Sequence, residues 1–192
     1  MTALVALIPF LANDRLFIRA RAARAVPGAL TFEYEISGEI PASSGQAGEA
    51  DWSETDRRDG LWRTTCFEAF VARPGEPGYW EFNFSDQVGW NVYRFSGQRQ
   101  GMGREPGALG VRRQRTERST HAHWRFEVRM SSELARELAG PLDVSLAAVM
   151  ESADGRFSHW ALAHACAAPD FHARAGFRIS LGADGRTGEE TK

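Results

Sequence analysis

Hydrophobic and polar residues alternate with a period of two along most of the chain, as in β-strands with one buried face. Between residues 30 and 36, for example, apolar side chains alternate with Thr31, Glu33 and Glu35. Such a strand has one face on the core and the other in water. The same pattern predicts strands within residues 2–12, 16–21, 30–36, 63–72, 79–84, 89–95, 111–116, 123–130, 143–151, 159–163 and 176–181.

Two segments lack this alternation and are predicted to be long loops. Residues 41–60 are polar and rich in Gly, Ser and Asp, and residues 96–110 are rich in glycine. One helix is predicted at 132–139, with Ser131 as its N-cap and Gly140 and Pro141 after its end. Many short strands with turns between them predict an all-β fold, a β-sandwich of antiparallel sheets with one short helix.

Composition narrows the class of protein. The chain has 192 residues, of which 43% are hydrophobic, so it can form one sizeable core. We expect a single domain at 1–182 and a flexible C-terminal tail at 183–192. The net charge of -2 gives no general attraction to nucleic acid or to an anionic membrane. The apolar N-terminus lacks a basic segment and is interrupted by Pro9, so we predict a cytoplasmic protein.

Cysteine and histidine give little indication of a metal or catalytic site. Cys66 falls within a predicted strand and is expected to be a buried free thiol, although a disulfide with Cys166 stays open. The His121 and His123 pair is interpreted as a solvated strand start. Asp170, near the C-terminus, is expected to accept backbone N–H bonds and tether a loop.

The candidate ligand site comes from the central strands. One face of 79–84 is wholly aromatic and is predicted to be core. If the strands are neighbours, the polar side chains of Glu68, Glu81, Asn83 and Arg94 can share one sheet face. Carboxylates and amides bind hydroxyl groups, and flat rings stack on sugars. The candidate ligand-binding residues are Trp62, Arg63, Glu68, Tyr79, Glu81, Asn83, Trp90 and Arg94. Alternatively, the charges only pair with one another across the strands.

Six segments carry a resemblance to a known family. They read LWRTTCFEAF at 61–70, YWEFNFS at 79–85, WNVYRF at 90–95, RQGM at 99–102, HWALAH at 159–164 and PDFH at 169–172. Together they resemble the bacterial DOMON-like proteins, which are related to family 9 carbohydrate-binding modules. The resemblance extends from the first strand to Phe177. It implies an immunoglobulin-like or jelly-roll-type sandwich of two antiparallel sheets, in a superfamily that binds sugars or haem.

We therefore expect a non-catalytic ligand-binding domain for a carbohydrate or a similar polar small molecule, without a cofactor. The first alternative, implied by the resemblance, is a b-type haem protein with Met102 and either His164 or His172 as iron ligands. The second is an enzyme that uses Glu68 or Glu81 as acid or base. The sequence leaves open the ligand, the oligomeric state and whether the polar face is open to solvent.

Overall fold

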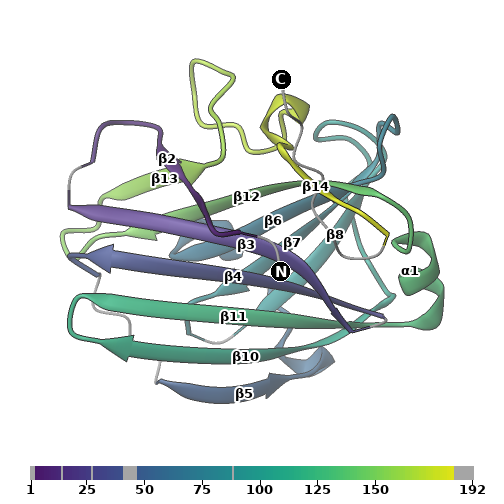
Figure 1. Ribbon diagram of the computed structural model, residues 1–192, viewed down its shortest axis with the longest axis horizontal. Helices are drawn as coiled ribbons and strands as arrows, with labels where there is room; N and C mark the ends of the chain where they lie inside the picture. The colour runs from purple at the N-terminus through teal and green to yellow at the C-terminus, as the bar shows by residue number, and fades with distance from the viewer. Residues whose placement is uncertain (1–2, 14, 27, 41–46, 88, 184–192) are drawn as a thin grey trace.

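The computed structural model describes residues 3–13, 15–26, 28–40, 47–87 and 89–183. Over these residues the chain forms two antiparallel sheets that pack face to face (Figure 1). The predicted all-β sandwich with one short helix is confirmed. The predicted tail, 183–192, lies outside the described residues except for Ala183.

Sheet A has six strands and sheet B has eight. In spatial order, sheet A contains β1 (Val5–Ala6), β3 (Leu16–Val26), β4 (Ala29–Gly38), β11 (His121–Met130), β10 (Ala108–Arg118) and β5 (Gly48–Trp52). Sheet B contains β2 (Ile8–Pro9), β13 (Phe157–Ala161), β12 (Leu142–Glu151), β6 (Cys66–Ala72), β7 (Tyr79–Ser85), β8 (Trp90–Phe95) and β9 (Gly103–Arg104), with β14 (Ile179–Leu181) also paired to β12.

Large aromatic side chains from the inner faces of both sheets fill the core. Phe84 of sheet B stacks on Phe126 of sheet A at 4.4 Å between ring centroids. The predicted aromatic face of β7 points inward, since Trp80 and Phe82 are buried in the same core. Alternation along single strands was therefore enough to identify this face, because every second side chain of a strand points the same way.

The helix α1 (Ser132–Glu137) begins where the sequence predicts. The side chain of Ser131 accepts a hydrogen bond from the Leu134 N–H at 3.2 Å, which confirms the N-cap. The helix ends two residues earlier than predicted, and Leu138 at its C-cap is buried. Within the described part of the chain, no helix has the length and apolarity needed to span a membrane.

Two predictions about connecting segments were wrong. Part of the predicted loop at 41–60 is strand β5, which pairs with β10 and buries Trp52 in the core; the short 3₁₀ turn η1 (Glu54–Asp56) follows. The predicted N-terminal strand is two short strands, β1 in sheet A and β2 in sheet B. Leu7 lies between them and is buried, so the chain crosses from one sheet to the other at this point.

The limits of the central segments also differ from the prediction. The predicted strand at 63–72 begins only at Cys66, because Leu61–Arg63 form a 3₁₀ turn, η2. The predicted loop at 96–110 contains the short strand β9 and includes the start of β10 at Ala108. Short turns such as η2 and strands of two residues such as β9 carry no period-two pattern, so alternation does not show where they begin and end.

Candidate functional site

A layer of polar side chains lies on the outer face of sheet B, on the side of β6, β7 and β8 that points away from the core. We call it the polar layer; it consists of Cys66, Glu68, Tyr79, Glu81, Asn83, Asn91 and Tyr93. Strand register brings its members together. Glu68 pairs with Asn83, and Asn83 pairs with Asn91, so a carboxyl group and two amides form one row across three strands.

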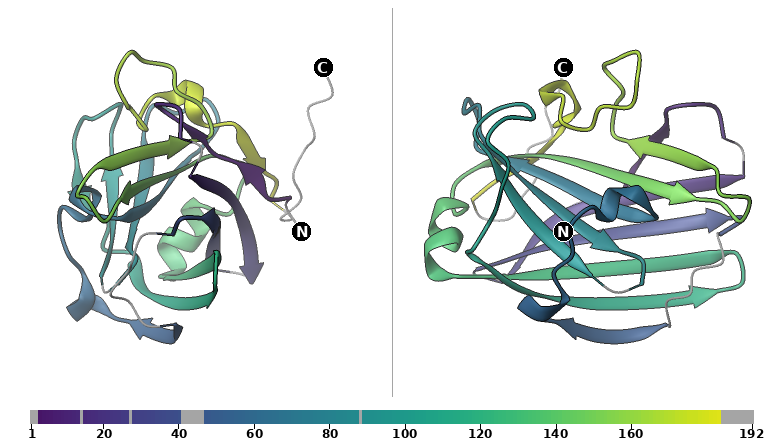
Figure 2. Two further views of the ribbon diagram at one scale, coloured as in Figure 1. Left: turned by 90° about the vertical axis from the view of Figure 1, so that its left-hand side faces the viewer. Right: turned by 180° about the vertical axis from the view of Figure 1, so that it is seen from behind.

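The polar layer is closed to solvent although it lies on the outer side of a sheet. Glu68 is 3% exposed, Glu81 is 4% exposed and Asn83 is fully buried. Two segments that we call the cover, residues 58–63 and 163–177, lie over it. The turn η2 contacts both β6 and β7, and Figure 2 (right) shows the blue segment that contains it in front of sheet B.

The two carboxyl groups are the least satisfied part of the layer. The Glu81 Oε1 accepts a hydrogen bond from the Asn83 Nδ2 at 2.7 Å. The Glu68 Oε1 is buried and has no hydrogen-bond partner among the described residues. Burial raises the pKa of Glu68 well above its usual range, and the charge of Glu81 adds to this effect. Burial also raises the pKa of Glu81, to about 7. The pair therefore holds protons near neutral pH.

A histidine of the cover reaches this acid pair. The Tyr79 hydroxyl accepts the Arg99 backbone N–H at 3.1 Å and lies 2.7 Å from the His172 Nδ1. Tyr79 can thus donate its proton to Nδ1, which leaves the His172 proton on Nε2, 3.8 Å from the Glu81 Oε2. Burial, with the charge of Arg99, lowers the pKa of His172 to about 4, so the ring is neutral at pH 7.

Asp170 tethers the same part of the cover, as the sequence predicts. Its carboxylate accepts the backbone N–H of His172 at 3.1 Å. It also binds the side chains of Arg99 at 2.8 Å and Gln98 at 3.1 Å. The rings of His172 and Phe177 pack against Tyr79 below. Segment 163–177 is thus held at its rim by polar contacts and underneath by aromatic rings.

The opposite end of the polar layer is fully hydrogen-bonded. The Tyr93 hydroxyl donates to the Asp59 Oδ1 at 2.7 Å, and the Asn91 Nδ2 binds both groups at 3.0 Å. Arg104 pairs with Asp59 from the solvent side. Burial and the neighbouring carboxylate raise the pKa of Tyr93. Unsatisfied hydrogen-bonding capacity is therefore found at Glu68 rather than at this end.

The structure places six of the eight predicted site residues in the polar layer or in the cover. Glu68, Tyr79, Glu81 and Asn83 come together in the polar layer. Trp62 and Arg63 belong to the cover. The ring of Trp62 is 37% exposed and lies edge-on to Tyr93, with 6.0 Å between the centroids, and Arg63 is exposed.

The predicted grouping of Trp90 and Arg94 with these residues was wrong. Trp90 is fully buried in the core, and its Nε1 donates to the Ser53 carbonyl at 2.9 Å. Arg94 lies 5.0 Å from the ring of Trp80 and pairs with Glu137 at 2.9 Å. On β8 the even-numbered residues face the core side, since a strand turns successive side chains to opposite faces.

Sequence reasoning missed Asn91, Tyr93, Asp59 and Arg99 as members of the site. A signal for the first two was present, because placing Trp90 and Val92 on the core side puts Asn91 and Tyr93 on the polar side. No such signal exists for Asp59 and Arg99, which lie in turns outside the strands. Their places depend on how the chain returns over the sheet.

The cysteines are both free. Cys66 is buried, which confirms the prediction, and Cys166 is exposed. Burial raises the pKa of the Cys66 thiol well above its usual range. In the described part of the chain, no group of three or more His, Cys, Asp or Glu side chains is arranged to hold a metal ion.

The residues of the haem alternative lie in different surroundings. Met102 is 48% exposed, the His164 Nε2 lies 2.8 Å from the Ile8 carbonyl, and His172 binds Tyr79. No observation tests haem binding, and that alternative stays a prediction.

Comparison with known proteins gives a similarity in fold. No family model and no curated protein sequence matches the chain. Among solved structures, the chain is similar to a crystal structure described as a "putative carbohydrate-binding protein" from Bacteroides uniformis ATCC 8492, with a TM-score of 0.60 and 14% sequence identity. The similarity covers 91% of this chain and 84% of that chain. At this identity the two proteins share the fold.

Proposed function

We propose that the chain is a non-catalytic binding domain for a carbohydrate or a similar polyhydroxylated small molecule, and that the polar layer holds the ligand. The observation that carries the proposal is the buried Glu68 carboxyl group, whose Oε1 has no partner among the described residues. A buried polar atom left unpaired costs about 1–3 kcal/mol. A ligand hydroxyl group would remove that cost, since it can donate to an oxygen of the carboxyl group.

The surroundings of Glu68 also suit a sugar. Glu81 and Asn83 add a second carboxyl group and an amide, so donors and acceptors lie side by side. Phe70 and Tyr79, on the same outer face, add aromatic rings. Rings of this kind pack on the apolar face of a pyranose, while the polar groups bind its hydroxyls. Trp62 and Arg63 would complete the site from the cover.

Ligand entry requires the cover to move. The segments that form it consist of turns and irregular backbone, and one of their tethers is the Arg99–Asp170 ion pair at 2.8 Å, with Arg99 exposed. The Arg99 end of this pair is open to water, which weakens the attraction between the two charges. Loops that open for ligands come from such weakly held segments.

Two observations that do not concern single residues also support this function. The solved structure with the same fold is described as carbohydrate-binding, and the sequence segments at the polar layer resemble DOMON-like proteins. We further propose that the chain belongs with that bacterial family, acts in the cytoplasm and needs no cofactor.

The test is calorimetry against a panel of neutral mono- and oligosaccharides. Replacing Glu68 by Gln keeps the size of the side chain and exchanges one oxygen of the carboxyl group, which can accept a hydrogen bond, for an NH₂ group, which cannot. We expect E68Q to weaken binding roughly 2- to 10-fold, because a hydrogen bond between neutral groups contributes about 0.5–1.5 kcal/mol. E127Q is the matched control, since Glu127 lies on the outer side of sheet A and pairs with Arg125. Unchanged affinity in E68Q would remove the polar layer as the binding site.

A second candidate function is acid–base catalysis at the same place. The neutral ring of His172 next to Glu81, whose pKa is about 7, favours it, because such a group exchanges protons at neutral pH. Turnover of a glycoside by the parent protein, lost in both E81Q and H172Q, would support this function over simple binding.

A further inference from the structure

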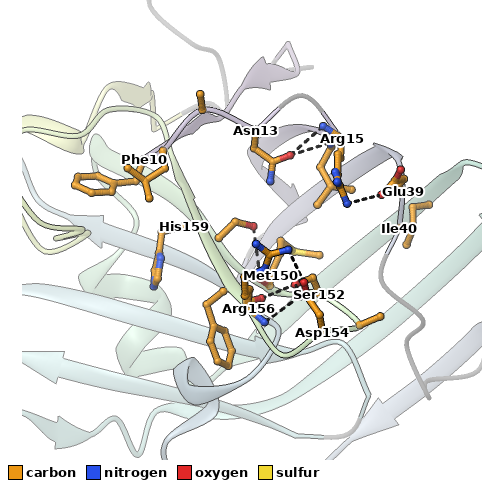
Figure 3. A pocket seen from close by; sticks show the side chains of 16 residues that line it. Phe10, Asn13, Arg15, Glu39, Ile40, Met150, Ser152, Asp154, Arg156 and His159 are labelled. Atoms are coloured by element: carbon orange, nitrogen blue, oxygen red, sulfur yellow. Dashed lines mark hydrogen bonds and ion pairs between the residues drawn. The ribbon is translucent and has the colours of Figure 1, made fainter.

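A second hollow lies at one end of the sandwich, away from the polar layer. Three segments form its walls: residues 10–13 with Arg15 and Leu16, from the end of β2 to the start of β3; residues 39–40 after β4; and the hairpin of β12 and β13 (Figure 3). The cleft has a volume of about 750 Å³. This lies within the range of roughly 300–1,000 Å³ that is usual for small-molecule sites. It shares no residue with the polar layer or the cover.

The cleft presents apolar side chains to solvent. Phe157 is 45% exposed and Leu11 is 76% exposed, and both line the hollow. Leu16 and Met150 are buried behind them and also line the cleft. Phe10 and His159 lie where two of these walls meet, since the Phe10 N–H donates to the His159 carbonyl at 2.8 Å (Figure 3). Open apolar surface concentrated in a hollow is typical of a place where a ligand packs.

The charges of the cleft balance. The Arg15 Nη1 lies 3.5 Å from the Glu39 Oε2, and the Arg156 Nε donates to the Asp154 Oδ2 at 2.7 Å. Burial lowers the pKa of His159, the fifth titratable group of the lining, so it is neutral at pH 7. The lining therefore has no net charge. A charged ligand would have to separate one of these ion pairs before it could form an ion pair with the cleft.

Hydrogen-bonding capacity remains after these pairs are made. A guanidinium group has five N–H donors, and each of these ion pairs uses only some of them. The Asn13 Oδ1 accepts the backbone N–H groups of Arg15 and Leu16 at 3.0 and 3.3 Å, which fixes the amide. Its nitrogen is then directed towards the cleft (Figure 3). Hydrogen-bond donors beside the exposed ring of Phe157 suit an uncharged, hydroxyl-rich molecule.

We infer that this cleft is a second binding site, open without any movement of the cover, and that it takes a neutral saccharide. The sugar packs an apolar face on Phe157, and its hydroxyl groups receive hydrogen bonds from Asn13 and Arg156. This inference does not depend on the polar layer, because none of the residues that carry it lies there.

The experiment is an amide NMR titration of the full chain with maltotriose and cellotriose, and with trigalacturonate as the anionic counterpart. We expect saturable shifts at residues 10–13, 15–16 and 150–159 with a neutral trisaccharide, and weaker binding of the anion. F157A should weaken the neutral sugar roughly 3- to 10-fold, the usual effect of one aromatic contact. F17A is the matched control, because Phe17 is 63% exposed on another surface.

The variant E68Q separates this inference from the proposed function. Shifts at the cleft that persist in E68Q and weaken in F157A support the second site. Shifts confined to the polar layer, equal affinity in F157A and the parent protein, tighter binding of trigalacturonate, or no shift at the cleft with either neutral trisaccharide would each overturn it. Since Phe157 is largely in solvent, F157A should keep the parent amide spectrum elsewhere.

Discussion

The buried carboxyl group of Glu81 gives a quantitative prediction about stability. In the unfolded chain its pKa has the ordinary value of 4.5, whereas burial in the folded protein raises it to about 7. The difference, 7 − 4.5, is about 2.5 pKa units, and each unit corresponds to 1.36 kcal/mol. Glu81 thus makes folding about 3 kcal/mol less favourable above pH 7 than below pH 4.5.

The sign follows from which state holds the proton. Below pH 4.5 both states are protonated, and the folded protein has no ionised group to bury here. As the pH rises through 7, the folded state must also ionise, and the stabilising contribution is lost. Glu81→Gln removes this titration while it keeps an oxygen that can accept the Asn83 hydrogen bond.

The assay is urea unfolding of E81Q and of the parent protein at several pH values from 4.5 to 8. Comparing the two at each pH cancels the other titrating groups. We expect E81Q to gain about 3 kcal/mol relative to the parent between pH 4.5 and 8. The exposed Glu49 is the matched control. Arg112 and Gln114 lower its pKa below the ordinary value of 4.5, so it stays ionised in the folded protein across this range, and the difference between E49Q and the parent should stay nearly constant. A constant difference between E81Q and the parent, within about 0.5 kcal/mol, would refute burial of an ionisable Glu81.

Three further predictions concern other parts of the molecule. The pKa of His172 falls to about 4 on folding, so the parent should lose stability relative to H172Q as the pH falls from 6.5 to 4. If paired urea titrations show no such loss, the His172 ring is not held neutral. Cys166 should react with a thiol reagent in the folded protein while Cys66 reacts only after unfolding, and mass spectrometry of the labelled peptides measures both. Phe84→Ala should destabilise the fold by about 3–5 kcal/mol in urea unfolding, because its ring stacks on Phe126 in the core, and a loss below 1 kcal/mol would be inconsistent with that packing.

The amino-acid sequence by itself determined the class of fold and the inner face of its central strands. Alternation is a local property, since neighbouring side chains of any strand point to opposite faces. It therefore identified Trp80, Phe82 and Phe84 as core residues and placed Glu81 and Asn83 on the opposite face. The cap at Ser131 was also predictable, because it depends on residues within one helical turn.

The tertiary structure alone decided that the polar face is closed. Residues 58–63 and 163–177 return over sheet B. The hydrophobic residues of these segments follow no regular spacing that would show where the segments pack. The contact of His172 with Tyr79 and Glu81 joins residues far apart in the chain. Burial under the cover is what shifts the pKa of Glu81, since a carboxylate loses its water there. A strand pattern can place a charge on a face, but only the path of the whole chain decides whether water reaches it.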